Sequence, residues 1–240
     1  MPKEKVTMGL SKEKAAPQYS DYLELFWDND RQLRTARFQD IFFSSNGIEE
    51  TRHVFIEGND LPTNFKENFH IGELGFGTGL NLFVALQLWR ERCPDSILQY
   101  TSFEIAPLPS KIMAEALEEF DAIGDICREF LSEWEKGKIK IEIPNLAFEL
   151  IVGDVRETIH TFNKKVDCWF LDGFSPSTNP EMWKEDLLQH VAERTKSRGT
   201  FATFSSASSV RENMMKAGFE ISRVPGFGKK KHMLKGVLSK

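Results

Sequence analysis

From residue 69 onward, short apolar runs alternate with stretches whose apolar side chains recur every three or four residues. Residues 69–74 read as a short strand, and residues 75–79 follow as a glycine-rich turn. Residues 81–92 then place their apolar side chains at helical spacing. This order predicts a strand, a loop and a helix in succession.

The same alternation continues to the C-terminus. Strands that alternate with helices indicate a mostly parallel sheet with helices on both faces, which is a Rossmann-like α/β fold. In such sheets ligands bind beyond the carboxyl ends of the strands. The predicted strands are 98–104, 148–152, 166–171 and 199–204, with two extended segments at 219–224 and 232–237. The predicted helices lie within 109–134, near 156–162, around 181–194 and at 207–217.

The residues before this repeating unit carry a different pattern. Residues 38–44 and 52–57 look extended, with the polar residues 45–50 between them. This pattern predicts a hairpin-like N-terminal arm, and a simple edge segment of the sheet fits it equally well. We therefore expect an arm over residues 1–67, packed on a main α/β domain over residues 68–240.

The composition excludes several classes of protein. Hydrophobic residues make up 40% of the 240 residues, with 20 Phe among them, which indicates a large buried core rather than a disordered chain. No apolar run approaches the roughly 18 residues of a membrane-spanning helix, and residues 1–14 are charged, unlike a signal peptide. Cys93, Cys127 and Cys168 never form a CxxC pair, so neither a disulfide framework nor a zinc site is indicated. We expect a cytoplasmic protein without a structural metal.

Charge is distributed unevenly along the chain. The net charge is -5, yet residues 194–240 hold 11 Lys and Arg against 2 acidic residues. The residues before them hold 20 basic against 34 acidic side chains. A basic end on an acidic body suggests an anionic partner at one face, although a short Lys run is most often a solvated surface.

The glycine-rich turn gives the first indication of chemistry. Gly75, Gly77 and Gly79 alternate after the strand, so the turn tolerates positive φ and lets a ligand approach the backbone closely. Glu73 precedes the turn, where it would repel a pyrophosphate and attract a cationic amino-acid group. Leu80 stands where a dinucleotide fingerprint needs its third glycine, and no Walker sequence occurs. S-adenosylmethionine, which carries a sulfonium and an ammonium but no phosphate, therefore fits better than NAD.

Two further acids follow the next strands. Glu104 ends the strand at 98–104, the position at which a carboxylate binds ribose hydroxyls. Asp154 follows the strand at 148–152, where it can accept a hydrogen bond from the adenine amine while Val155 offers its backbone amide. Each acid alone is more often a helix cap or a solvated strand end. Acids at three successive strand ends favour a shared ligand.

The strand at 166–171 is followed directly by Asp172 and by a turn rich in Gly, Ser and Pro. A structural turn with a capping Asp is the simpler interpretation. Because of the glycine-rich turn upstream, we favour Asp172 facing the methyl donor, with Phe174 and Trp183 walling the substrate.

Together these motifs resemble the methyltransferase domain of the MnmC family, which acts in the biosynthesis of tRNA 5-methylaminomethyl-2-thiouridine. The resemblance runs from about residue 38 to the C-terminus. The motifs that carry it are GIEETR at 47–52, EGN at 57–59, ELGFGTGLN at 73–81, SFE at 102–104, FLDGF at 170–174, NPEMW at 179–183 and GFGKKK at 226–231.

The resemblance implies transfer of a methyl group from S-adenosylmethionine to the amine of 5-aminomethyl-2-thiouridine at the wobble position of tRNA. Thr78 and Asn81 join the expected donor pocket. We assign Asp172 the aiming of the amine, and whether it also accepts the proton after transfer stays open. Bifunctional members of the family continue into an FAD-dependent oxidoreductase domain. We therefore expect either a standalone methyltransferase, with such an oxidoreductase acting in trans, or an excised domain.

The tRNA would bind at the basic C-terminal end. Glu50 and Arg52 are expected on the wall opposite Asp172. Two alternatives stay open: a tRNA-binding module with a vestigial cofactor pocket, and an NAD-dependent oxidoreductase. The residues expected to hold the anticodon arm are Arg198, Arg211, Lys229, Lys230 and Lys231.

Overall fold

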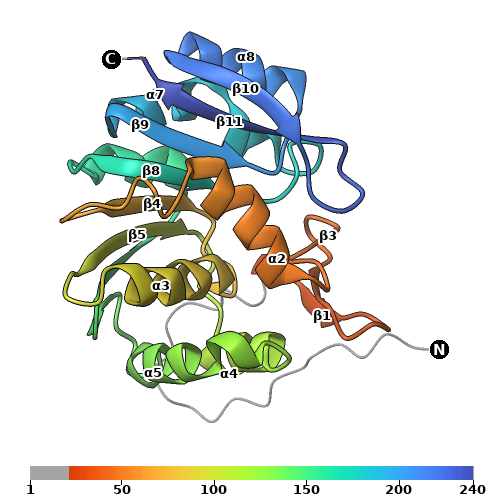
Figure 1. Cartoon of the computed structure of the whole chain (residues 1–240). Helices are drawn as coiled ribbons and strands as arrows, with labels where there is room; N and C mark the ends of the chain where they lie inside the picture. The colour runs from red at the N-terminus through yellow and green to blue at the C-terminus, as the bar shows by residue number, and fades with distance from the viewer. Residues whose placement is uncertain (1–21, 240) are drawn as a thin grey trace.

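The computed structural model describes residues 22–239, with a large sheet at its centre (Figure 1). Its strands are β4 His70–Leu74, β5 Leu98–Glu104, β6 Lys140–Ile143, β7 Leu146–Val152, β8 Val166–Leu171, β9 Thr195–Thr203, β10 Phe219–Pro225 and β11 His232–Leu238. They are ordered β10-β11-β9-β8-β4-β5-β7-β6. The five inner strands from β9 to β7 are parallel, whereas β6, β10 and β11 are antiparallel additions at the two edges.

Helices cover both faces of this sheet, as the alternating pattern predicts. One face carries α3 Leu80–Arg92, α4 Ser110–Leu117, η3 Asp121–Ile123 and α5 Gly124–Trp134. The other carries α6 Val155–Thr158, η4 Ile159–Thr161, η5 Pro180–Trp183, α7 Glu185–Glu193 and α8 Ser208–Lys216. Side chains of β8 alternate between the two: Cys168 and Phe170 join the first core, Trp169 and Leu171 the second. The Rossmann-like fold class is confirmed.

The N-terminal segment differs from the prediction in its second half. Strands β1 Leu25–Trp27, β2 Leu33–Thr35 and β3 Asp40–Ile41 form a small antiparallel sheet. The chain from Gly47 to Asn59 is then helical, comprising α2 Gly47–Thr51, the π-helical turn η1 Arg52–Ile56 and the 3₁₀ turn η2 Glu57–Asn59. The predicted extended segment at 52–57 is therefore wrong.

The reason for this error lies in the burial pattern. Ile48, Thr51, Val54 and Phe55 are all buried and recur at helical spacing, although Val and Phe alone favour strands. Gly58 permits close packing of the helical end on β9, because a Cβ there would lie 2.7 Å from the Cβ of Ala202. The helical segment crosses the front of the sheet in Figure 1 and belongs to the same core as α3.

The pattern locates all five parallel strands and the β10–β11 pair but misses β1, β2 and β6. Strand β6 is a four-residue edge strand with one fully buried side chain, Ile141, too short for alternation to reveal. The interpretation of residues 1–14 lies outside the described residues, and the division into an arm over 1–67 and a main domain over 68–240 stays a prediction. Within residues 22–239, no helix combines the length and apolar character that crossing a bilayer requires.

Candidate active site

A cavity of about 1080 Å³ opens where the parallel strands end. Segments that follow β4, β5, β7 and β8 line it, as expected for a ligand site at the carboxyl edge of such a sheet. The arm with the start of α2, and the turn between β10 and β11, complete its walls. Of the predicted site residues, those lining it are Glu50, Gly75, Gly77, Thr78, Asn81, Glu104, Asp154, Val155, Asp172, Phe174, Lys229 and Lys230.

The glycine-rich turn packs tightly against the end of β8. Gly75 has a φ of 86°, and a Cβ there would lie 2.4 Å from the backbone oxygen of Asp172, so the turn excludes any other residue. Gly79, with a φ of 81°, is the N-terminal residue before α3 and lies behind the cavity surface. The turn thereby holds the ends of β4 and β8 side by side.

Glu104 is fixed in front of this turn. Its Oε2 accepts a hydrogen bond from the amide of Gly77 at 3.0 Å, and its Oε1 accepts one from the amide of Ala106 at 2.8 Å. Burial raises the pKa of its carboxyl, while these backbone donors lower it. Each oxygen keeps a further lone pair with which to accept a ribose hydroxyl.

We expect Glu104→Gln to weaken the binding of S-adenosylmethionine by about tenfold to a hundredfold, equivalent to about 1–3 kcal/mol. The amide replaces one acceptor by a donor, which faces a backbone N–H and can no longer accept from a hydroxyl. Calorimetric titration measures the affinity, with Glu142→Gln on the exposed side of β6 as the matched control. An unchanged affinity in folded Glu104→Gln protein would remove Glu104 from the donor site.

Asp154 has a neighbour that the sequence pattern did not single out. Its Oδ1 accepts from the backbone amide of Arg156 at 3.0 Å, capping α6, and its carboxylate also pairs with the Arg156 guanidinium. The hydrogen bonds from Arg156 hold the pKa of Asp154 below its usual range. Arg156 lines the cavity and reaches Glu181 at 3.0 Å. Asp154 is thus held in an ion pair with Arg156 at the edge of the cavity.

Asp172 stands at the centre of a polar network. Its Oδ2 accepts a hydrogen bond of 2.7 Å from the side-chain amide of Asn81, which also donates to Glu73 Oε1 at 3.0 Å. Burial raises the pKa of Asp172 to about 7, against the lowering effect of the Asn81 hydrogen bond. A carboxyl that titrates near neutrality inside a ligand cavity is suited to accept a proton.

Glu73 is fully buried behind the cavity wall, at 0% exposure. Its Oε2 accepts from the hydroxyl of Ser102 at 2.8 Å. Burial raises the pKa of Glu73 to about 8. A carboxyl that keeps its proton at neutral pH and does not reach the cavity surface is poorly placed to attract a cationic ligand directly, so its predicted contact with the donor stays a prediction.

The raised pKa of Glu73 has a consequence for stability. Between its ordinary pKa of 4.5 and its folded pKa of about 8, the folded protein holds a proton that the unfolded chain releases. The free energy of unfolding therefore falls as pH rises, by about 1.4 kcal/mol per pH unit from this group. We expect Glu73→Gln to remove this dependence. The free energy of unfolding of the variant should therefore rise relative to that of the wild type between pH 5 and pH 8.

Urea unfolding at several pH values measures the effect, and Glu142→Gln again serves as the control. Equal pH dependence in Glu73→Gln and wild-type protein would show that Glu73 is ionised in the folded state at neutral pH.

Aromatic rings form the wall beside Asp172. Phe174 stacks on Phe38 with ring centroids 4.6 Å apart and meets the ring of Phe42 edge-on at 5.7 Å. Trp183 is buried and does not line the cavity; its indole N–H donates to the backbone oxygen of Phe174 at 3.1 Å. Trp183 therefore holds the turn after β8 in place. Phe38 and Phe42, which the sequence pattern missed, line the cavity beside Phe174, where Trp183 was expected.

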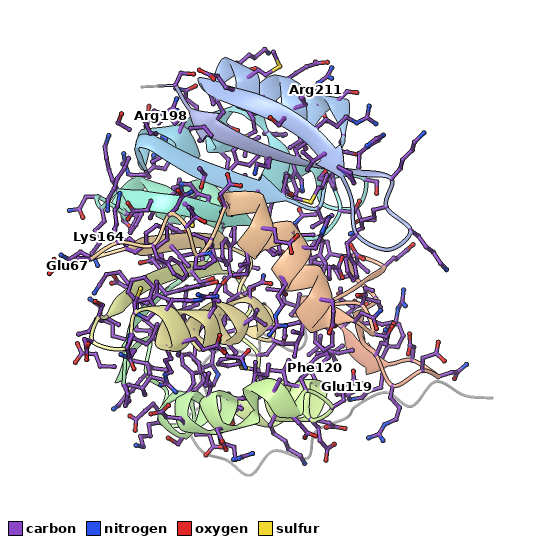
Figure 2. The ribbon with its side chains drawn as sticks, viewed as in Figure 1. Glu67, Glu119, Phe120, Lys164, Arg198 and Arg211 are labelled. Atoms are coloured by element: carbon purple, nitrogen blue, oxygen red, sulfur yellow. The ribbon has the colours of Figure 1, made fainter. Side chains whose placement is uncertain are left out.

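The predicted basic residues do not form one surface. Lys229 and Lys230 line the cavity, and Lys230 lies 3.6 Å from Glu50 and 3.9 Å from the ring centroid of Phe204. Lys231 follows in the same exposed turn. Arg52 is exposed outside the cavity and bonds Gln87 at 3.4 Å. Arg198, before the buried part of β9, and Arg211, on α8, do not line the cavity; both lie in the upper part of Figure 2, on different sides of the molecule.

The fold and the cavity define a class of protein: a Rossmann-like sheet with a glycine-rich turn, a carboxylate at the next strand end and no phosphate-binding sequence. Residues 118–239 match the family described as S-adenosyl-L-methionine-dependent methyltransferase, and the chain belongs to that family. S-adenosylmethionine is its methyl donor, which argues against the NAD-dependent alternative. Among residues 22–239, no cluster of His, Cys, Asp or Glu suits a metal ion.

Within that family, the chain corresponds to the methyltransferase part of the MnmC proteins. It is 40% identical over 227 residues to the "tRNA 5-methylaminomethyl-2-thiouridine biosynthesis bifunctional protein MnmC" of Caulobacter sp. (strain K31), covering 89% of this chain and 38% of the relative. The protein of the same name from Leptospira borgpetersenii is 41% identical over 90% of this chain and 35% of its own length. The chain thus spans little more than a third of these relatives.

A solved structure agrees with this assignment. The crystal structure of MNMC2 from Aquifex aeolicus superimposes with a TM-score of 0.75 at 26% sequence identity, covering 89% of this chain and 70% of that one.

Proposed function

We propose that the chain transfers a methyl group from S-adenosylmethionine to the amine of 5-aminomethyl-2-thiouridine at the wobble position of tRNA, forming 5-methylaminomethyl-2-thiouridine. The names of the relatives support the substrate. The observation that carries the chemistry is Asp172, a carboxyl at the cavity surface that titrates near 7 and lies next to the glycine-rich turn.

The residues present fit the methyl donor. The glycine-rich turn offers backbone without side chains at Gly75 and Gly77, both on the cavity surface. Glu104 supplies acceptors for the ribose hydroxyls, and Asp154 with the amide of Val155 supplies an acceptor and a donor for adenine. When bound, the sulfonium donor provides an electrophilic methyl group.

Asp172 prepares the nucleophile. An amine with a pKa of about 10.4 costs roughly 4–5 kcal/mol to deprotonate at pH 7, and only its neutral form carries the attacking lone pair. Asp172 accepts a hydrogen bond from the amine, which aims the lone pair, and takes the proton that the nitrogen loses. Alignment supplies the rest of the rate enhancement, because this displacement creates no oxyanion.

The aromatic wall receives the uracil ring. A wobble base must leave the anticodon stack to reach Asp172, and aromatic side chains bind splayed bases by stacking. Phe174 lines the cavity directly beyond Asp172, and Phe38 and Phe42 fix its ring. A base that enters the cavity therefore meets a rigid apolar surface next to the carboxylate.

The anticodon arm lies against the turn at 226–231. Lys229 and Lys230 stand at the cavity itself, and Lys231 is exposed beside them, so phosphates near the flipped base come within reach of their charges. Glu50 and Arg52 border the same side on α2 and η1. Arg198 and Arg211 do not line the cavity, so we leave them out of this contact, which revises the expectation drawn from net charge alone.

A flavin-dependent oxidoreductase is the proposed partner, since the relatives are bifunctional and extend well beyond this chain. Cytoplasm, where tRNA is modified, is the proposed compartment. The assay that tests the reaction uses two synthetic anticodon stem-loops, one with 5-aminomethyl-2-thiouridine and one with 2-thiouridine. We expect methyl transfer to the first alone; methylation of both, or of neither, would contradict the proposal.

A further inference from the structure

The Asn81 side chain joins three groups at the wall of the cavity. Its Nδ2 donates to Asp172 Oδ2 at 2.7 Å and to Glu73 Oε1 at 3.0 Å, and its Oδ1 accepts from the hydroxyl of Thr51 at 2.8 Å. Thr51 and Asn81 are 3% and 7% exposed. Both amide hydrogens and the amide oxygen therefore have partners within the protein.

The orientation of the Asn81 amide decides whether Glu73 and Asp172 receive a hydrogen bond from it. In the observed orientation the amino group faces Glu73 and Asp172. In the reverse orientation the amide oxygen would face the Asp172 carboxylate, and Asp172 would lose a donor that favours its anionic form. The Asp172 carboxylate, which can only accept, selects the observed orientation. The Thr51 hydroxyl donates to the amide oxygen from the opposite side, so its removal would leave that oxygen without its partner and the amide less firmly held.

We propose that Thr51 and Asn81 are positioning residues for methyl transfer: the Thr51 hydroxyl locks the Asn81 amide, and the locked amino group holds Asp172 aimed at the cavity. The link to turnover rests on the proposed function, whereas the link to the state of the Asp172 carboxyl does not.

The two positioning residues belong to separate helices. Thr51 ends α2 and Asn81 lies in the first turn of α3, and the contact between them fixes α2 against the base of the glycine-rich turn. Asn81, which was expected only in the donor pocket, thereby also orients Asp172. The buried Glu73 takes part as well, because its Oε1 accepts a hydrogen bond from the same amino group and helps to hold that group in place.

Several charged or titratable groups surround Asp172 and contribute to its titration. Glu73 reaches it from β4 through Asn81, Glu50 from α2, and Lys230 from the β10–β11 turn. The buried phenol of Tyr100 on β5 keeps its proton, because burial raises its pKa well above the usual value. Loss of the Asn81 donor leaves all these groups in place, so its effect on Asp172 can be separated from theirs.

The test compares Thr51→Ala, which removes the hydroxyl, with Thr51→Ser, which keeps it. Carbon-13 NMR of labelled aspartate in the full chain follows the titration of Asp172. We expect Thr51→Ser to titrate like the wild type and Thr51→Ala to raise the pKa of Asp172 by about one unit. At pH 7 this shift reduces the ionised fraction of Asp172 to about a fifth of that in the wild type. The kcat of Thr51→Ala should therefore fall about fivefold at pH 7 and recover at pH 9. Its affinity for S-adenosylmethionine should stay unchanged.

Thr51→Val, which keeps the branched shape without the donor, takes the place of Thr51→Ala if the smaller residue prevents folding. An Asp172 titration in either variant that matches the wild type would overturn the proposal. So would a loss of kcat of equal size at all pH values that Thr51→Ser fails to restore, since that is the behaviour of a packing defect. If no variant or wild-type protein methylates tRNA, the proposed function fails, yet the NMR comparison still decides the positioning role.

Discussion

The Asp172→Asn protein is expected to turn over modified tRNA at least about a hundredfold more slowly than the wild type, because general-base catalysis typically contributes a factor of 10²–10⁴. Asparagine keeps the shape and can still accept the Asn81 hydrogen bond, but it cannot take a proton from the amine. Binding of S-adenosylmethionine should be nearly unchanged, since the interaction with the amine develops chiefly in the transition state.

The pH profile gives the same prediction a second readout. Burial raises the pKa of Asp172 to about 7, so the base is increasingly protonated, and inactive, below that pH. The wild-type kcat/KM should therefore fall about tenfold per unit below pH 7 from this group, and Asp172→Asn should lack this limb. Asp125→Asn, in which an exposed carboxylate on α5 is replaced, serves as the matched control. Wild-type turnover in Asp172→Asn protein would contradict the role given to Asp172.

The second large effect is expected at the lysine turn. Replacing Lys229, Lys230 and Lys231 together by Ala should weaken tRNA binding and reduce the slope of log affinity against log salt by about 2–3, because each phosphate contact contributes about 0.7–0.9. Binding is the quantity to measure, since Lys230 also lowers the pKa of Asp172 and affects turnover separately.

A control with the same change in net charge separates local contacts from general attraction. Arg198, Arg211 and Lys216 are exposed and do not line the cavity, so their joint replacement by Ala should leave the salt slope close to that of the wild type. If the distal variant loses the slope and the lysine-turn variant keeps it, the anticodon arm binds away from the lysine turn.

The sequence predicts the strand ends well because parallel strands deliver their following residues to one edge. Glu104, Asp154 and Asp172 could therefore be placed around one cavity from their positions after predicted strands. Position along the sequence does not tell how deeply a side chain is buried. Glu73 and Trp183 were therefore expected at the surface of the cavity, although both are buried. A count of charges along the sequence likewise does not show which face of the fold each side chain occupies. For that reason Arg198 and Arg211 were grouped with the lysines of the turn at 226–231.

Contacts between distant segments lie beyond such patterns. Thr51 and Asn81 are separated by 30 positions and meet only because residues 47–59 are helical, where β-branched and aromatic residues suggested a strand. Phe38 and Phe42 reach the cavity through the same fold of the arm. The chemistry at the strand ends was predictable, whereas the groups that orient it required the structure.

The decisive experiment for methyl transfer to the wobble nucleoside is incubation of the protein with labelled S-adenosylmethionine and tRNA from cells that lack this methylation, followed by nucleoside analysis. We expect 5-aminomethyl-2-thiouridine to disappear and labelled 5-methylaminomethyl-2-thiouridine to appear in wild-type reactions, and far less of the product to form in the same time with the Asp172→Asn protein. Label on any other nucleoside, or equal label in both reactions, would contradict this expectation.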